Sequence, residues 1–221
     1  MFFQYENLLE KALQYSSWVH DYREKYFVEN YSYFHSCLND PKIKFIQFVV
    51  NPYSRVVSSY LHIMRNNYSK QDNVSNLTFN EYLNMLYSGK LLPNTHHNKQ
   101  TFFINKNIEF VRMEEIEKRL PEINKKYGLN YDNNHTSTHY AKRKSEEKKF
   151  LGNTKWEDFK NNIPKDYSNF YNPEIRQKVD ILYGEDIINF GYTWEMFKKN
   201  NYLEKYNEKQ RKIYTSKKIF N

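Results

Sequence analysis

The sequence is poor in cysteine, the residue that forms disulfides and binds structural zinc. It contains one cysteine, Cys37, in 221 residues, which excludes a disulfide within the chain and a cysteine-rich zinc site. No apolar run approaches the roughly 18 to 20 residues that span a bilayer, and the first residues lack the basic and then apolar pattern of a signal peptide. We therefore expect a soluble chain without a transmembrane segment, and the cysteine usage slightly favours the cytoplasm.

The balance of charge is basic. Lys and Arg number 34 against 26 Asp and Glu, for a net charge of +8 and a pI near 9.2. This balance favours anionic partners such as nucleic acid, a nucleotide, an anionic glycan or an acidic membrane surface, without choosing among them. The length predicts a single domain over residues 1–221, of which 193–221 form a charged tail.

The central stretch, residues 42–60, predicts a strand that turns into a helix. Residues 45–50 are a short apolar run of the kind that forms a buried strand. Asn51 is a candidate N-cap and Pro52 suits the first helical position. Arg55 and Ser58 then lie near the first turns, where free N–H groups and the helix dipole favour negative charge. The corner is a candidate anion site, although an ordinary strand, cap and helix would have the same letters.

The segment Asn51-Pro52-x-x-Arg55-x-x-Ser58 resembles the motif Arg-Asn/Asp-Pro-x-x-Arg-x-x-Ser of carbohydrate sulfotransferases and their bacterial relatives. That resemblance implies that Asn51, Arg55 and Ser58 bind the 3′-phosphate of the donor PAPS (3′-phosphoadenylyl sulfate). The family's leading arginine is Val50 in this chain, so one phosphate ligand is missing.

A helical pattern at residues 5–13 opens the chain, whereas these enzymes begin with a strand and a lysine-containing phosphate loop. No Gly-rich or Pro-Lys-x-x-x-Thr-Ser-like loop precedes this pattern. We therefore expect either an N-terminally truncated form, whose loop a second chain could supply, or a descendant that no longer binds the donor in the usual way.

His35 is a candidate catalytic base. Residues 29–38 are predicted to form a second strand that ends near it, and Tyr33-Phe34-His35 resembles the Tyr-His-x-His segment of the 2-O-sulfotransferases. A neutral imidazole can take the proton of an acceptor hydroxyl near pH 7. The alternative is a histidine that bonds only to backbone.

Two further segments supply candidate binding residues. His97-Asn98-Lys99-Gln100 fits the His-x-x-Gln segment of the same relatives, which implies that His97, Lys99 and Gln100 face the donor sulfate or the acceptor. Lys142 and Arg143 stand in a basic loop that in relatives closes over the donor phosphates. A surface role for the first segment and a solvated loop for the second are the alternatives. No metal site is expected.

The remaining pattern predicts packing elements. A helix begins at Thr78 with Glu81 as its capping box and ends at Ser88-Gly89. A strand covers residues 108–112, and the helix after it is broken or restarted at Pro121 and stops at Gly128. Residues 171–192 resemble the family's closing helix in spacing and are assigned to structure, with Asn172 as cap and Gly184 as a stop.

The motifs follow the family's order from residue 29 to residue 192. They predict an α/β, P-loop NTPase-like sulfotransferase fold with a central parallel sheet. The implied function is transfer of a sulfuryl group from PAPS to a hydroxyl of a carbohydrate or another acceptor. A catalytically inactive sulfotransferase-like binding module or fragment is the first alternative, and a basic nucleic-acid-binding protein is the second.

Overall fold

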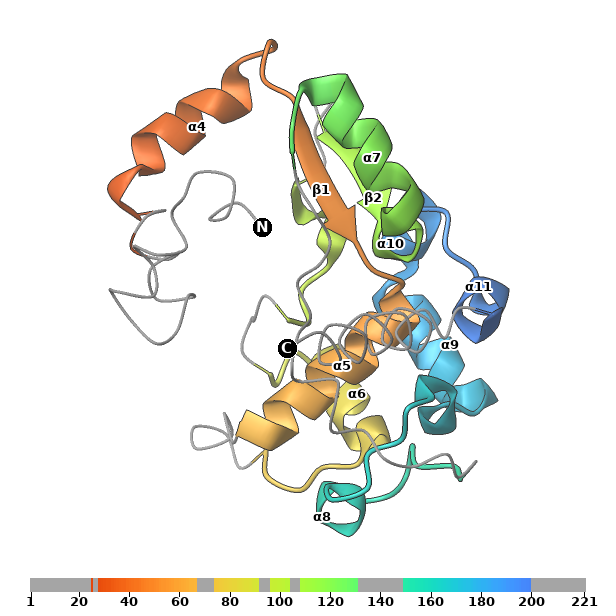
Figure 1. The fold of residues 1–221 in the computed structure, drawn as a ribbon. Coiled ribbons are helices and arrows are strands. Elements are labelled where there is room, and N and C mark those ends of the chain that lie inside the picture. The colour runs from red at the N-terminus through yellow and green to blue at the C-terminus, as the bar shows by residue number, and fades with distance from the viewer. Residues whose placement is uncertain are drawn as a thin grey trace, which may run out of the picture. The chain divides into compact units, whose positions relative to one another are not determined.

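A computed structural model describes residues 25, 28–66, 74–91, 96–103, 108–130 and 149–199 (Figure 1). The elements in chain order are α4 (Tyr31–Asn39), β1 (Phe45–Val49), α5 (Pro52–Asn66), α6 (Phe79–Tyr87), η2 (Gln100–Phe103), β2 (Ile108–Arg112), η3 (Met113–Glu115), α7 (Ile116–Tyr127), α8 (Trp156–Phe159), η5 (Tyr167–Phe170), α9 (Pro173–Leu182), α10 (Gly184–Asn189) and α11 (Trp194–Lys199). None of the helices in these ranges has the length and hydropathy that a bilayer crossing requires.

The fold is mixed α/β with a small parallel sheet of two strands, β1 and β2. Both strands fall where the apolar runs predicted them, and the α/β class is confirmed. The chain divides into two compact units. Unit 1 comprises residues 1–47, 105–111 and 115–133, and unit 2 comprises residues 48–104, 112–114 and 134–221.

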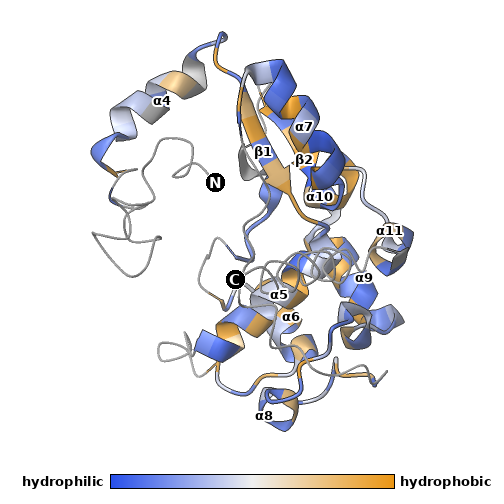
Figure 2. Cartoon of the chain, in the orientation of Figure 1, coloured by the Kyte–Doolittle hydropathy of each residue, from blue (hydrophilic) through white to orange (hydrophobic). Residues whose placement is uncertain are grey.

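In unit 1, helix α7 is tied to strand β2 by one carboxylate. Glu109 accepts hydrogen bonds from Arg119 at 3.0 Å, Lys126 at 2.7 Å and the Tyr127 hydroxyl at 2.7 Å. The bond from Lys126, followed by that from Tyr127, lowers the pKa of Glu109. Packing also needs apolar surface. Figure 2 shows that β1 is largely hydrophobic and that α7 has a hydrophilic side and a hydrophobic side.

Two predictions in unit 1 are wrong. Residues 31–39 form helix α4 and not a strand. A helix satisfies its backbone N–H and C=O groups internally, whereas a strand needs a neighbour, and in the described residues β1 pairs with β2 alone. Pro121 lies inside α7 without ending it. Proline donates no N–H to the residue four positions before it, and this turn of the helix is exposed at Glu117 and Pro121, so the helix tolerates the proline there.

The core of unit 2 forms around helix α5. The apolar face of this helix is buried, with Val56, Val57 and Tyr60 at 1 % exposure or less. Aromatic rings from α6 and η5 pack on it, among them Phe79 at 5.5 Å and Phe170 at 6.0 Å from the Tyr60 ring. Helices α6 and α9 both contact α5 and each other.

Local capping in this chain follows the sequence closely. Thr78 and Glu81 form the predicted capping box of α6, Asn172 caps α9, and Gly128 ends α7 with φ of +62°. Gly184 differs from its prediction, because α9 ends at Leu182 and Gly184 begins α10.

Candidate functional site

The corner between β1 and α5 lies in unit 2 and has the predicted N-cap. The Asn51 side-chain oxygen accepts the Tyr53 N–H at 3.1 Å, and the Asn51 residue is 2 % exposed. The N–H of Asn51 itself donates to the Glu114 carboxylate at 2.8 Å. The helix start thus already has a carboxylate beside it, which the positive end of the helix dipole favours.

Glu114 is held in place by Tyr192. The Tyr192 hydroxyl lies 2.8 Å from the second Glu114 oxygen and 3.0 Å from the Val49 carbonyl oxygen. Arg112 secures the same segment by donating to the Phe190 carbonyl at 2.9 Å. Glu114 stands in an acidic stretch after strand β2, which by itself does not point to the corner, and the sequence pattern places Tyr192 in a structural segment.

Arg55 is a half-buried cation at the second turn of α5. Its guanidinium donates to the Asn98 carbonyl at 2.5 Å. Burial lowers the pKa of Arg55, while Tyr183 and Asp186 act in the opposite direction. Arginine remains protonated in proteins, so a positive charge is held next to the segment 97–100. The structure therefore brings together two of the motifs found separately in the sequence.

Ser58 follows Arg55 by three residues on the same helix. Residues three apart lie on one side of a helix, and Ser58 is half-buried there. The adjacent Ser59 is buried and shares a hydrogen bond of 2.9 Å with the Tyr82 hydroxyl. The two serines differ in environment, with Ser58 on the side of Arg55 and Ser59 in the core.

Gln100 binds the end of strand β1 through its side chain. Its amide nitrogen donates to the Val50 carbonyl at 2.8 Å, and its amide oxygen accepts the Val50 N–H at 2.9 Å. These two bonds continue the backbone pairing by one residue, directly before Asn51. The Gln100 side chain thus supports the corner.

Asp186 fixes the segment that carries Gln100. The carboxylate is 0 % exposed and accepts the N–H of Gln100 at 2.9 Å and of Thr101 at 3.0 Å. Burial lowers the pKa of Arg55, and the negative charge of Asp186 opposes this effect. Asp186 belongs to residues 171–192, which the sequence pattern assigns to structure alone. The sequence feature that could have pointed to its role is the pattern Tyr-x-x-Asp that ends at Asp186.

His97 and Lys99 have different surroundings. His97 is 8 % exposed, with the Tyr82 hydroxyl 3.4 Å from its Nδ1 and its carbonyl accepting the Tyr183 hydroxyl at 2.7 Å. Burial raises the pKa of both Tyr82 and Tyr183, so both stay protonated. Lys99 is exposed and pairs with Glu185 at 3.1 Å.

The remaining predicted site residues are His35, Lys142 and Arg143. His35 lies in unit 1 on α4, where it is exposed and its ring is 6.0 Å from that of Tyr31. Lys142 and Arg143 lie outside the described residues. Within the described part of the chain, no group of three or more His, Cys, Asp or Glu side chains is arranged to hold a metal. No family model, curated protein or solved structure matches the chain.

Proposed function

We propose that the chain is a sulfotransferase with a P-loop-like fold that transfers a sulfuryl group from PAPS to a hydroxyl, with a carbohydrate as the acceptor class. The observation that carries the proposal is the half-buried guanidinium of Arg55 at a capped strand-to-helix corner, beside the segment 97–100. Partial removal of a cation from water costs free energy, which a bound anion offsets. The 3′-phosphate of PAPS is an anion of this kind.

The phosphate would be bound by side chains more than by the helix amides. The N–H groups of Asn51 and Tyr53 already donate to carboxylate and amide oxygens. The Arg55 guanidinium carries N–H donors in a planar fork that matches a phosphate, and Ser58 adds a hydroxyl on the same side of α5. Charge-assisted bonds contribute about 1.5 to 3 kcal/mol each.

In the proposed reaction, the acceptor oxygen attacks sulfur in line, the bond from sulfur to the bridging phosphate oxygen breaks, and adenosine 3′,5′-bisphosphate (PAP) leaves. His35 would take the acceptor proton, His97, Lys99 and Gln100 would bind the sulfate or acceptor, and Lys142 and Arg143 would bind the donor phosphates. Positioning and charge stabilisation supply most of the catalysis in such transfers.

A catalytically silent binding module is the second candidate. The Glu114 carboxylate beside the start of α5 favours it, because this negative charge lies where relatives bind phosphate and Val50 replaces a phosphate-binding arginine. A module of this kind would bind PAP weakly and transfer no sulfuryl group.

Thermal unfolding with and without PAP tests the proposal. A ligand that binds the native state at a hundred times its Kd stabilises that state by about 2.7 kcal/mol, so PAP should raise the Tm of the parent chain. Arg55→Ala and Ser58→Ala should lose this rise, whereas Ser54→Ala, at a variable position of the motif on the same helix, should keep it. No rise in the parent at millimolar PAP would contradict the proposal.

Transfer of labelled sulfate from PAPS to a mixed glycan acceptor then separates the two candidates. Label in the glycan supports the transferase, and a PAP-dependent rise in Tm without label supports the silent module. Duplex DNA or RNA binding that weakens steeply with salt, without any effect of PAP, would instead indicate a nucleic-acid-binding protein.

A further inference from the structure

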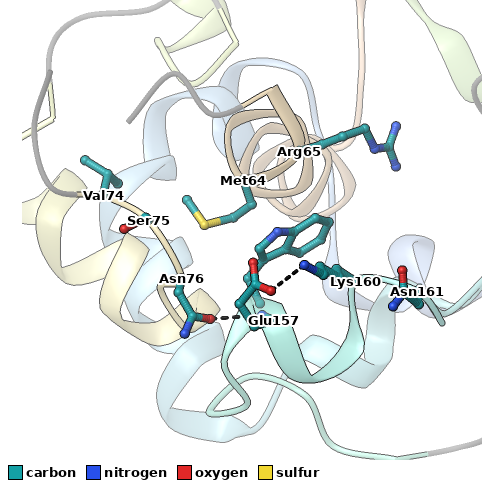
Figure 3. Close-up of a pocket in the computed structure, with 9 residues that line it drawn as sticks. Met64, Arg65, Val74, Ser75, Asn76, Glu157, Lys160 and Asn161 are labelled. Carbon is teal, nitrogen blue, oxygen red and sulfur yellow. Dashed lines mark hydrogen bonds and ion pairs between the residues drawn. The ribbon is translucent and has the colours of Figure 1, made fainter. Parts of the chain in front are cut away.

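A pocket of about 490 Å³ lies in unit 2 at the far end of α5. Its lining comes from the last turns of α5, the turn at residues 74–76, and α8 with the residues after it (Figure 3). Met64 follows Pro52 by twelve residues of helix, which places it about 18 Å along the axis at 1.5 Å per residue. The pocket shares no residue with the corner that holds Arg55.

The floor of the pocket is apolar and its frame is fixed. Met64, Val74 and Trp156 are 3 to 7 % exposed. Asn76 has a left-handed backbone with φ of +60°, and its side-chain oxygen accepts the Glu157 N–H at 2.9 Å. These contacts set the distance between the turn and α8 before any ligand binds.

Several polar groups of the lining have no partner in the part of the chain that the structure describes. Trp156 is 7 % exposed and belongs to the hydrophobic core of unit 2, where its ring lies 5.5 Å from that of Phe159. Its N–H donates to no acceptor in the described part of the chain, yet it is not sealed from solvent. The side chains of Arg65, Ser75 and Asn161 likewise have no partner among the described residues. Because the Trp156 N–H reaches solvent, an acceptor on a ligand can replace the water that bonds to it.

The charges of the lining favour an acidic ligand. Arg65 and Lys160 are positive, and Glu157, which is paired with Lys160, is the one negative side chain of the nine. In Figure 3, Arg65, Lys160 and Asn161 lie on one side of the pocket, and Val74, Ser75 and Asn76 lie on the other. An anionic group would thus meet cations on one side, and neutral polar groups would meet hydroxyl and amide partners on the other.

We propose that this pocket binds a saccharide unit that carries a carboxylate or a sulfate. Six of the nine lining residues are polar or charged, which suits a ligand with many hydroxyls better than a lipid. Trp156 is too buried to offer its ring face to a nucleobase. The proposal stands independently of the sulfotransferase function, because neither Arg55 nor Ser58 takes part in it.

The test uses the indole N–H signals of the ¹⁵N-labelled full chain in NMR. The chain has three tryptophans, and Trp156→Phe identifies the signal of Trp156. A hyaluronan tetrasaccharide should shift this signal in a saturable way and leave those of Trp18 and Trp194 unchanged. Neutral chitotetraose, which shares the N-acetylglucosamine units, should bind about tenfold more weakly, a difference of about 1.4 kcal/mol.

Charge variants make the test specific. Arg65→Gln and Lys160→Gln should each weaken binding by about three- to tenfold, whereas Lys90→Gln, an exposed lysine outside the pocket, should leave it unchanged. An unmoved Trp156 signal, equal binding of chitotetraose, or a full shift by inorganic sulfate alone would each overturn the proposal. A shift of the Trp156 signal caused by PAP would overturn it too. A PAP-induced rise in Tm that leaves the Trp156 signal unchanged would bear only on the proposed PAPS site at the Arg55 corner.

Discussion

Neighbouring residues in the segment 97–100 have very different surroundings. Gln100 completes the pairing of strand β1 through two hydrogen bonds to Val50, whereas Lys99 next to it extends outward to Glu185. The letters of the His-x-x-Gln pattern are the same whether its side chains face a ligand or the protein. The contacts distinguish the two cases, and for Gln100 they indicate support of the corner.

Gln100→Ala should therefore destabilise the chain. The substitution leaves the N–H and the C=O of Val50 without partners in a half-buried place, and an unsatisfied buried group costs about 1 to 3 kcal/mol. Urea denaturation should show a lower midpoint with an unchanged slope. Lys99→Ala removes an exposed ion pair worth at most about 1 kcal/mol and serves as the matched control. Equal midpoints for the two variants would show that the amide does not hold the strand.

Single residues were predictable where their partner is close in the chain. Asn51 bonds to the N–H two residues on, and Asn172 bonds to the N–H three residues on. Glu114 and Asp186 bond to groups 63 and 86 residues away. A local sequence pattern does not predict contacts between residues so far apart in the chain. The roles of Glu114 and Asp186 at the corner are therefore visible only in the folded structure.

At the scale of elements, the strands and caps followed the sequence and one helix did not. Strands β1 and β2 are apolar runs of β-branched and aromatic residues, which suit a half-buried sheet. Residues 31–39 have tyrosines as well, but of the side chains described in α4 only Cys37 is buried. Without burial or a neighbouring strand, a segment with β propensity can instead form a helix, because a helix satisfies its backbone hydrogen bonds internally.

The capping box of α6 gives a prediction at this scale. The Thr78 hydroxyl accepts the Glu81 N–H at 3.0 Å, and the Thr78 N–H donates to the Glu81 carboxylate at 2.7 Å. Thr78→Ala should lower the free energy of unfolding by about 1 kcal/mol. Thr78→Ser keeps the hydroxyl and should stay close to the parent in urea denaturation. A loss of equal size in both variants would point to the methyl group instead of the cap.

For the molecule as a whole, acid should be the destabilising direction of pH. Glu81 in unit 2 and Glu109 in unit 1 have lowered pKa values, Glu81 chiefly through Lys155 and Glu109 chiefly through Lys126. Carboxylates of this kind stabilise the fold fully above their unfolded pKa, for which the ordinary value is 4.5. That contribution is lost as pH falls through the lowered values, because the unfolded chain then binds more protons.

Unfolding free energies measured from neutral to acid pH should therefore level off above the ordinary glutamate pKa and fall below it. Glu81→Gln and Glu109→Gln should each flatten the acid slope. Added salt should narrow the difference from the parent for the exposed Glu81 pair more than for the less exposed Glu109. A slope that neither substitution changes would assign the acid response to other groups.

Helix α5 carries the Arg55 corner near its start and the saccharide pocket near its end, with about 18 Å of rigid rise between Pro52 and Met64. The length of an oligosaccharide therefore matters as much as its charge. By the two proposals, a short acidic sugar occupies the pocket alone, whereas a chain long enough to reach also the acceptor residues beside the corner, His97 and Lys99, would bind that second place as an intramolecular event. Affinity should then rise abruptly once the oligosaccharide exceeds the span of the helix.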